Sequence, residues 1–299
     1  MTNRRTFLAG GLAVAGGAAV LASARSVAGS GPTIKVGSKQ FTESWIMGEL
    51  YAQLLTAQGF HVVLKSNIGS STIIDRAIVS GEIDLYPDYT GVILQSIALA
   101  EKLPPTAEGT WAEAKRFEET RGLTLLEKTP FQNRNAVAVR RADAERHGLR
   151  TIADLAKLGD VQYAEYPDNI TGPFGYEALV KSYKLPRLKV RPLNIGLQYP
   201  ALESGRVQAA DVFTTDPQLR RYDFTILEDD LHIFGFQNVA PVVRLPILRQ
   251  YGARVSGPLN RVNALLTEPA MQALNEAVAI LRLSPAEVAR RFLRANRLI

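Results

Sequence analysis

Short apolar runs alternate with helix-like stretches in the first part of the chain. The run 34–37 has the composition of a β-strand, and from Thr42 to Gly59 apolar residues recur at helical spacing. The runs 61–64 and 83–86 predict two more strands, separated by a helix that starts at 69–72 and ends at a Ser-Gly pair. This alternation predicts an α/β domain with a largely parallel sheet.

The second part of the chain continues the same alternation and predicts a second lobe. Two of its strands, 136–139 and 239–245, are expected where the chain leaves one lobe and later crosses back. The remaining predicted elements are strands at 161–164 and 207–213, helices starting at 151–155 and after 172–175, and closing helices at 269–281 and 285–293.

We therefore expect two α/β lobes, with the second lobe inserted into the first. The first lobe is predicted over 33–133, the second over 134–215, and the return to the first lobe, with the C-terminal helices, over 216–299. At 299 residues with 46% hydrophobic composition, the chain has enough apolar material for two such cores.

One internal similarity suggests that the two lobes are built alike. The segments 77–84 and 201–208 share a helix, a Ser-Gly pair and the start of a strand, and each is followed by an aromatic residue and threonine, at Tyr89 and Phe213. An aromatic side chain at a strand end in each lobe is the arrangement that a cleft-binding protein needs.

The first 28 residues have the pattern of an export signal. A short polar start is followed by an Ala/Gly/Leu/Val stretch from Phe7 to Ala22, and small residues at A-x-A-like spacing predict cleavage near Ala24 or Ala28. The stretch is short and Gly-rich for a retained membrane anchor, the alternative interpretation. Paired arginines before Phe7 resemble the twin-arginine motif of bacterial Tat signals, whereas a Sec signal would carry such a pair by chance.

The charge and the cysteine content of the chain exclude several classes of partner and site. Removal of residues 1–28 takes three arginines and no acid, so the formal charge falls from +6 to +3, and a nucleic-acid partner is no longer supported. The chain contains no cysteine, which excludes disulfides, thiolate metal sites and a lipid anchor at the signal junction. We expect a free protein in a Gram-negative periplasm.

Sequence motifs for catalysis are absent. The three histidines have no metal-binding spacing, and no nucleophile elbow, phosphate loop or dinucleotide fingerprint occurs, so we expect no cofactor, no metal and no enzyme. A secreted enzyme that uses Asp88, Glu165 or Asp216 as acid–base groups is the rival hypothesis.

Three motifs carry a family resemblance: Gly37-Ser38-Lys39-Gln40-Phe41-Thr42-Glu43, Gly69-Ser70-Ser71-Thr72, and the run from Ser80 to Gly91 that includes Tyr86-Pro87-Asp88-Tyr89-Thr90. They closely resemble the substrate-binding proteins of osmoprotectant ABC importers, which bind glycine betaine, choline, carnitine or proline betaine. The resemblance spans residues 33–299. It implies a two-lobed type II periplasmic-binding fold, with the ligand between the lobes and an ABC permease as partner.

The resemblance also implies a ligand site. In this family tyrosine faces hold a quaternary ammonium by cation–π attraction, and basic and hydroxyl groups hold a carboxylate. The cage positions fall on Tyr89, Asn135, Tyr199 and Phe213, and the carboxylate positions fall on Lys39, Val92 and Asn169, with Glu165 as an associated acid.

The departures from the family pattern bear on the ligand. Asn135 lacks an aromatic face, and Val92 and Asn169 lack the clamp groups, so glycine betaine should bind weakly, or the two asparagines hydrogen-bond a more polar ligand. Tyr166, Phe174 and Tyr176 could rebuild an aromatic wall, although we expect these residues to serve in helix packing instead. We expect a monomeric receptor that performs no chemistry; a ligand-sensing protein with a membrane partner is the third hypothesis.

Overall fold

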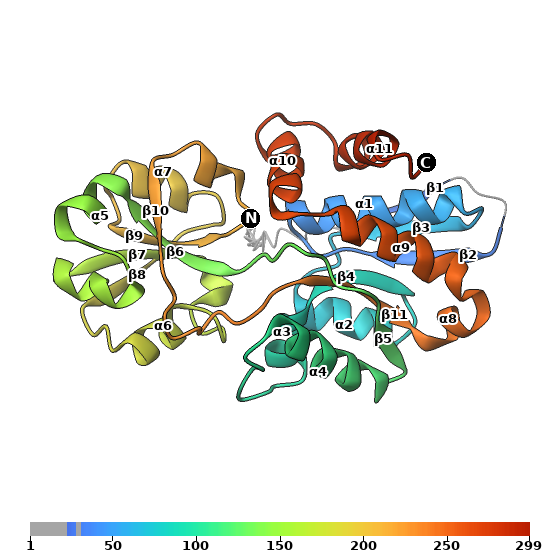
Figure 1. The fold of residues 1–299 in the computed structure, drawn as a ribbon, viewed down its shortest axis with the longest axis horizontal. Coiled ribbons are helices and arrows are strands. Elements are labelled where there is room, and N and C mark those ends of the chain that lie inside the picture. The colour runs from blue at the N-terminus through green and yellow to red at the C-terminus, as the bar shows by residue number, and fades with distance from the viewer. Residues whose placement is uncertain (1–22, 28–30) are drawn as a thin grey trace, which may run out of the picture.

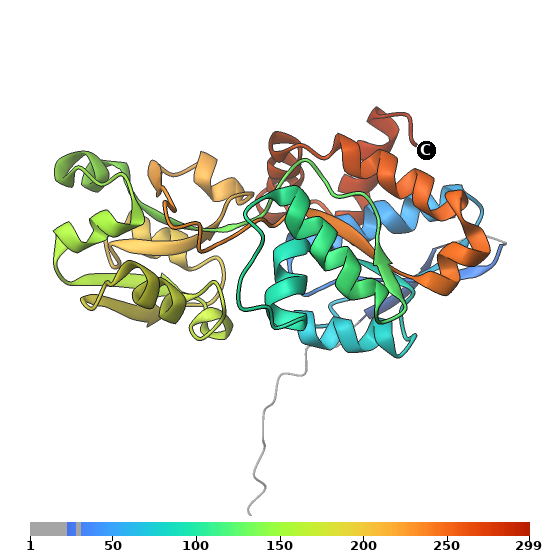
Figure 2. The same cartoon turned by 60° about the horizontal axis from the view of Figure 1, so that its bottom comes forward.

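The computed structural model describes residues 23–27 and 31–299, and these form two α/β lobes (Figure 1). Most of the predicted signal, residues 1–22 and 28, therefore lies outside the described residues. In both views the lobes stand side by side and are joined by two crossing segments (Figures 1 and 2). The two-lobed α/β fold class predicted from the sequence is confirmed.

Lobe I is built on a six-stranded sheet in the order β1-β3-β2-β4-β11-β5. Its strands are β1 (Ser23–Val27), β2 (Thr33–Gly37), β3 (His61–Ser66), β4 (Leu85–Tyr89), β5 (Leu123–Leu125) and β11 (Val239–Arg244). Its helices are α1 (Thr42–Ala57), α2 (Ser71–Val79), α3 (Thr90–Val92), the π-helical turn η1 (Ile93–Ile97), α4 (Ala107–Glu119), α8 (Leu245–Tyr251), α9 (Ala253–Leu265), α10 (Glu268–Ala279) and α11 (Pro285–Ala295).

Lobe II is built on a five-stranded sheet in the order β10-β6-β9-β7-β8. Its strands are β6 (Asn135–Arg140), β7 (Val161–Glu165), β8 (Leu188–Pro192), β9 (Ala209–Phe213) and β10 (Phe224–Leu227). Its helices are α5 (Arg141–His147), α6 (Tyr176–Tyr183), α7 (Gln198–Glu203) and the 3₁₀ turns η2 (Ile152–Leu158), η3 (Pro167–Asn169) and η4 (Pro217–Arg220).

Each sheet carries a hydrophobic core on both faces, because neighbouring strand residues point to opposite sides. Along β11, Val239 and Val243 pack with α1 and the C-terminal helices, whereas Ala240 and Val242 pack with α2 and α4. α1 is apolar almost all round because it lies between the sheet and helices α9, α10 and α11.

The sheets are mixed rather than largely parallel, and here the prediction was wrong. β2 runs parallel to β3 and β4, and β7 runs parallel to β8 and β9. β6 and β11 enter their sheets from the other lobe and run antiparallel to both of their neighbours. The first strand after each crossing between the lobes, β6 in lobe II and β11 in lobe I, therefore runs opposite to its neighbours.

The predicted end of lobe II at residue 215 also needs correction. β10 (Phe224–Leu227) pairs with β6 at the edge of the lobe II sheet, so the chain returns to lobe I only after Leu227. The segment after β9 first contacts α10 through η4 and then turns back to form this short strand. With only four residues, β10 is too short to show a clear alternation of apolar and polar positions, and it was not predicted.

The two crossing segments lie beside each other between the lobes. Residues 126–134 lead from β5 to β6, and residues 228–238 lead from β10 to β11. Gln132 and Asn238 form an isolated antiparallel bridge, and the Asn133 N–H donates to the Gln237 carbonyl at 3.1 Å. The two segments are therefore paired with each other where the chain passes between the lobes.

Candidate ligand-binding site

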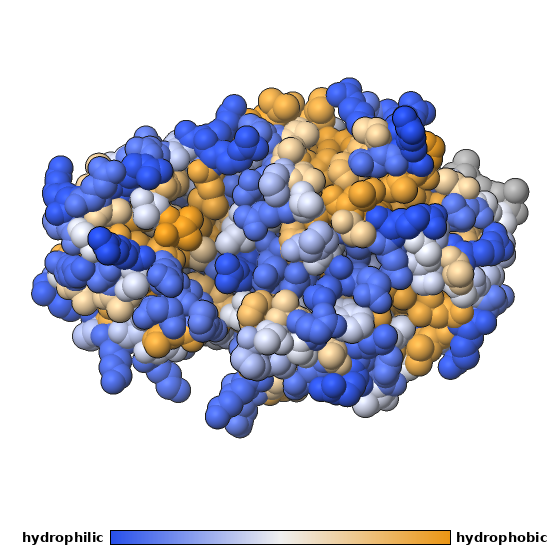
Figure 3. Space-filling model, in the orientation of Figure 1, coloured by the Kyte–Doolittle hydropathy of each residue, from blue (hydrophilic) through white to orange (hydrophobic). Residues whose placement is uncertain are grey.

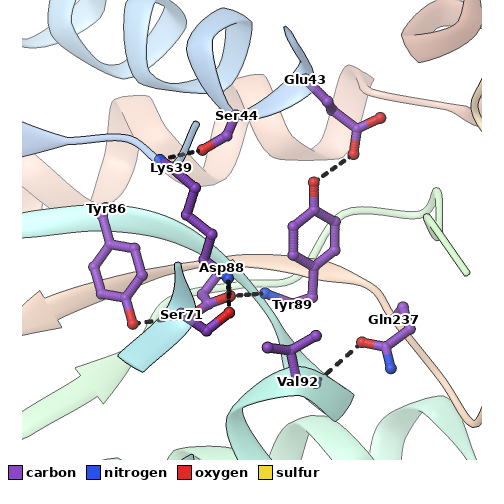
Figure 4. Close-up of polar contacts among 9 residues, drawn as sticks. All are labelled: Lys39, Glu43, Ser44, Ser71, Tyr86, Asp88, Tyr89, Val92 and Gln237. Carbon is purple, nitrogen blue, oxygen red and sulfur yellow. Dashed lines mark hydrogen bonds and ion pairs between the residues drawn. The ribbon is translucent and has the colours of Figure 1, made fainter. Parts of the chain in front are cut away.

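The lobe I half of the site follows the carboxyl ends of β2 and β4 (Figure 4). Lys39 comes two residues after β2, and its backbone N–H donates to Ser44 Oγ at 2.8 Å. Its buried ammonium group forms an ion pair with Asp88 and donates to Ser71 Oγ at 2.9 Å. The sequence singled out Lys39 as a carboxylate-binding group, and the structure already compensates its charge.

Asp88 organises this half of the site. Besides Lys39, its carboxylate accepts hydrogen bonds from the Tyr86 hydroxyl and the Tyr89 backbone N–H, both at 2.8 Å. The aspartate is fully buried, and these donors satisfy its oxygens. Asp88 therefore fixes Lys39 and Tyr89 relative to each other.

Tyr89 is the aromatic residue of lobe I. Lys39 Nζ lies 5.5 Å from the centre of its ring, and the Phe41 ring lies 6.0 Å away. Its hydroxyl donates to Glu43 at 2.7 Å, and burial, with the nearby Glu43, holds the pKa of Tyr89 well above its usual value. Nearby, the Val92 backbone N–H donates to Gln237 Oε1 at 3.1 Å, while the half-buried valine side chain packs against the cores of both lobes.

The lobe II half of the site lies at the ends of β6 and β9. Asn135 and Phe213 are direct cross-strand partners. The Asn135 amide nitrogen donates to both Asp211 oxygens, at 3.0 and 3.1 Å. The Tyr166 ring lies 5.9 Å from the Phe213 ring, so an aromatic pair stands next to the asparagine. Phe174 and Tyr176, by contrast, pack into a lobe II core.

Two buried carboxyl groups lie beneath this aromatic pair. Glu165 and Asp211 are each 1% exposed, and Glu165 accepts the Tyr166 backbone N–H at 2.9 Å. Burial raises the pKa of both groups, and the nearby Glu165 adds to the rise at Asp211. At Glu165, hydrogen bonds from the Tyr166 backbone and the Asn169 side chain oppose the rise. The hydrogen bonds of the two carboxyl groups in the described chain involve no lysine or arginine.

Tyr199 takes a position that the sequence did not predict. It is 2% exposed, its ring packs into the core between α7 and the lobe II sheet, and its hydroxyl donates to Asp216. Asp216 also accepts the Phe213 N–H at 3.1 Å, and burial raises its pKa to about 7. In this structure Tyr199 contributes to the site through Asp216 and not as an open ring face.

Glu43 connects the two halves of the site and was missed as a functional residue. The sequence assigned it only to a helix start, although it ends the first quoted motif. Its carboxylate accepts the Tyr89 hydroxyl in lobe I and the Thr215 hydroxyl just after β9 in lobe II, both at 2.7 Å. The carboxyl ends of β4 and β9 therefore meet at Glu43, the usual place for a ligand in open α/β sheets.

Metal-ligand clusters and membrane-spanning helices are both absent from the part of the chain that the structure describes. No group of three or more His, Asp or Glu side chains in 23–27 and 31–299 is arranged to hold a metal ion. No described helix is long and apolar enough to cross a membrane. On the face drawn in Figure 3, hydrophilic residues follow the junction of the lobes, and hydrophobic residues gather over the C-terminal helices.

The fold and the site define a two-lobed binding protein whose two halves meet through hydrogen bonds to Glu43. Residues 32–295 match the substrate-binding domain of ABC-type glycine betaine transport systems. The chain belongs to this family, as its motifs suggested.

Individual relatives agree with this assignment. The chain is 33% identical over 280 residues to a glycine-betaine-binding protein of Pseudomonas aeruginosa, covering 89% of each chain. It is 28% identical over 269 residues to a carnitine transport binding protein of Listeria monocytogenes, covering 88% of this chain and 87% of the relative. A crystal structure described as a glycine betaine/carnitine/choline ABC transporter superimposes with a TM-score of 0.75 at 27% identity, covering 89% of this chain and 99% of that one.

Proposed function

We propose that the protein captures a small quaternary-ammonium or related zwitterionic or cationic solute between its lobes and delivers it to an ABC permease. The observation that carries the proposal is the meeting of Tyr89 from lobe I with the Phe213 loop of lobe II at Glu43. Glycine betaine and carnitine, which the relatives are named for, both carry a quaternary ammonium group. Aromatic faces and buried carboxylates attract such a cation without needing a donor from it.

Asn135 favours a ligand whose cationic group carries an N–H. Because a carboxylate only accepts hydrogen bonds, the Asn135 amide nitrogen faces Asp211, and its oxygen is left as an acceptor. A quaternary ammonium has no N–H to offer this oxygen, whereas a tertiary ammonium has one. A more polar cation with an N–H group is therefore the second candidate ligand. The buried Asn169, which is 6% exposed and lies beside Glu165, adds a second polar side chain to this half of the site.

A thermal-shift screen followed by calorimetric titration tests the proposal. Glycine betaine, choline, carnitine and dimethylglycine, which has one N-methyl group fewer than betaine, cover the two ligand types. We expect at least one of them to raise the melting temperature and to bind with 1:1 stoichiometry. Stabilisation by none of these compounds or of their close derivatives contradicts the proposal.

The proposal includes no chemical step, and the same sample tests this. The three acids of the enzyme hypothesis are held by different partners: Asp88 by Lys39, Glu165 by the Tyr166 N–H, and Asp216 by Tyr199. Mass spectrometry of the solute released after incubation should find it unchanged. A converted product supports the enzyme hypothesis instead.

We further propose that the protein reaches the periplasm through the Tat pathway and acts there as a monomer. The paired arginines Arg4 and Arg5, followed by Phe7 and Leu8, support Tat export, with cleavage near Ala24 or Ala28. Cleavage at Ala24 shortens the edge strand β1, and cleavage at Ala28 removes it from the mature lobe I sheet. Replacement of both arginines by lysine should leave the precursor in the cytoplasm, as measured by fractionation and immunoblotting. Normal appearance of the mature protein in the periplasm indicates a Sec signal.

A further inference from the structure

Glu43 is a buried carboxylate that receives four hydrogen bonds at the junction of the lobes. It is the second residue of α1 and is 3% exposed. Its Oε1 accepts from the Tyr89 hydroxyl at 2.7 Å and from Asn133 Nδ2 at 3.1 Å. Its Oε2 accepts from the Thr215 hydroxyl at 2.7 Å and from Asn275 Nδ2 at 2.9 Å. All four donors are uncharged side chains, so no basic residue among them neutralises the carboxylate.

The four donors come from four different parts of the chain. Tyr89 ends β4, Asn133 lies in the first crossing segment, Thr215 lies in the loop after β9 of lobe II, and Asn275 lies in α10. Each carboxylate oxygen receives two donors. Burial raises the pKa of Glu43, and the four hydrogen bonds oppose that rise. The position in the first turn of α1 also favours a negative charge there.

The same loop of lobe II is held to α10 by two further bonds. Asn275 Nδ2 donates to the Thr215 carbonyl at 3.2 Å, and Gln272 Nε2 donates to the Thr214 carbonyl at 3.1 Å. The loop after β9 is therefore tied to lobe I at a point separate from the two crossing segments. Phe213 and Asp216, which belong to the lobe II half of the site, flank this tie directly.

We propose that Glu43 is a positioning residue that couples the two halves of the ligand site. It holds the Tyr89 ring through its hydroxyl and, with its other oxygen, the lobe II loop that carries Phe213 and Asp216. The inference rests on the proposed function, because the coupling affects affinity only if the ligand binds between the lobes. Glu43 acts through Tyr89 and Thr215 and needs no contact with the ligand.

Glu43→Gln tests the coupling with almost no change of volume. Glutamine keeps one acceptor oxygen but turns an N–H₂ group towards two donors, so it loses the hydrogen bonds on one side of the network. We expect the dissociation constant of the tightest binder among glycine betaine, choline and carnitine to rise about tenfold. Tyr89→Phe, which removes only the hydroxyl, and Thr215→Val should each weaken binding by a smaller factor.

A double-mutant cycle separates coupling from a general loss of stability. If Glu43 acts through the Tyr89 hydroxyl, the combined variant Glu43→Gln/Tyr89→Phe loses less affinity than the product of the two single losses. Glu49→Gln is the matched control, because Glu49 is a buried acid on the same helix but lines a separate cavity of about 320 Å³ in lobe I, between α1 and the start of α11. Glu49→Gln should bind with the wild-type dissociation constant.

Hydrogen exchange of the ligand-free protein gives a readout that does not depend on the ligand. Amides of residues 213–216 should exchange faster in Glu43→Gln than in the wild type or in Glu49→Gln, because the tie to lobe I is weakened. If the wild type binds neither these three solutes nor dimethylglycine or a close derivative, the proposed function fails, and exchange alone decides the coupling. If the wild type binds but Glu43→Gln keeps its dissociation constant within twofold, or if exchange at residues 213–216 is unchanged, the inference is wrong.

Discussion

Asn135 decides the chemistry of the lobe II half of the site at the scale of single residues. It stands directly opposite Phe213 with its amide nitrogen on Asp211, where the family resemblance implies a tyrosine. An amide in place of a ring removes a cation–π face and leaves a hydrogen-bond acceptor. The affinity for quaternary ammonium ligands should therefore fall, and the affinity for cations that carry an N–H group should rise.

The first prediction concerns this substitution. Asn135→Tyr should bind glycine betaine about tenfold more tightly than the wild type, since one cation–π face contributes roughly 1–2 kcal/mol. Tyr89→Ala should bind it more weakly, because it removes the lobe I ring. Calorimetric titration of the three proteins measures both effects. Tight betaine binding by the wild type, lost in Asn135→Tyr, contradicts the expected role of the missing ring.

The second prediction concerns pH. Burial raises the pKa of Asp216 to about 7, well above its value in an unfolded chain, and the Glu165–Asp211 pair is shifted in the same direction. Asp216 and Glu165 therefore ionise in the folded protein only as the pH rises through about 7. Choline keeps its charge throughout, so its affinity should increase several-fold between pH 6 and pH 8.

The control for the pH effect is Asp216→Asn, which keeps an acceptor for the Phe213 N–H but cannot ionise. Its choline affinity should vary less with pH than that of the wild type. The same raised pKa has an opposite effect on the ligand-free protein: the folded state binds more protons between about pH 4 and 7, so its stability falls as the pH rises through that window. Choline affinity that is flat from pH 6 to 8 contradicts the prediction.

At the scale of elements, much of the architecture could be predicted from the sequence. The alternating pattern predicted β2, α1, β3, α2, α10 and α11 close to their observed bounds, because each has a clear period and a turn residue at its end. Helices α4, α8 and α9 were not predicted. β5, β8 and β10 were missed because they are short or half-exposed, and their direction depends on pairing with distant strands. The aromatic positions Tyr89 and Phe213 were found at strand ends, as predicted.

Contacts between distant elements could not be predicted in the same way. Glu43 meets Thr215 and Asn275 across more than 170 residues of chain, and no local pattern marks such a contact. Asp211 lay inside a predicted strand, and only the pairing of β6 with β9 places it beneath Asn135. These networks depend on how lobes and helices are assembled, which hydrophobic periodicity does not encode.

The third prediction concerns the packing of α1 on α9. The buried Asn263 accepts from the Tyr51 hydroxyl at 2.9 Å and donates to the Glu127 carbonyl at 2.8 Å. Asn263→Ala leaves a buried hydroxyl without its partner and should lower the free energy of unfolding by about 1–3 kcal/mol. Denaturant unfolding measures this loss. Because these residues are distant from the site, ligand affinity should stay unchanged; an affinity loss as large as that of Tyr89→Ala contradicts this separation.

The whole molecule is two lobes joined by a narrow pair of crossing segments, and the fourth prediction concerns their movement. Ligand binding between Lys39 and Tyr89 on one side and the Phe213 loop on the other should close the lobes about residues 126–134 and 228–238. Small-angle X-ray scattering should then show a smaller radius of gyration at saturation. An unchanged radius with bound ligand excludes closure, and a complex structure with the solute elsewhere excludes the site.

The position of β11 has a consequence for how the chain folds during synthesis. β11 pairs with β4 on one side and with β5 on the other, yet it is made more than 110 residues after β5. The lobe I sheet therefore remains split until residues 239–244 leave the ribosome. Lobe II is continuous from β6 to β10 and is made in the interval, so it can complete its own sheet first. The inserted lobe is then the first to fold, and the lobe that begins and ends the chain is the last.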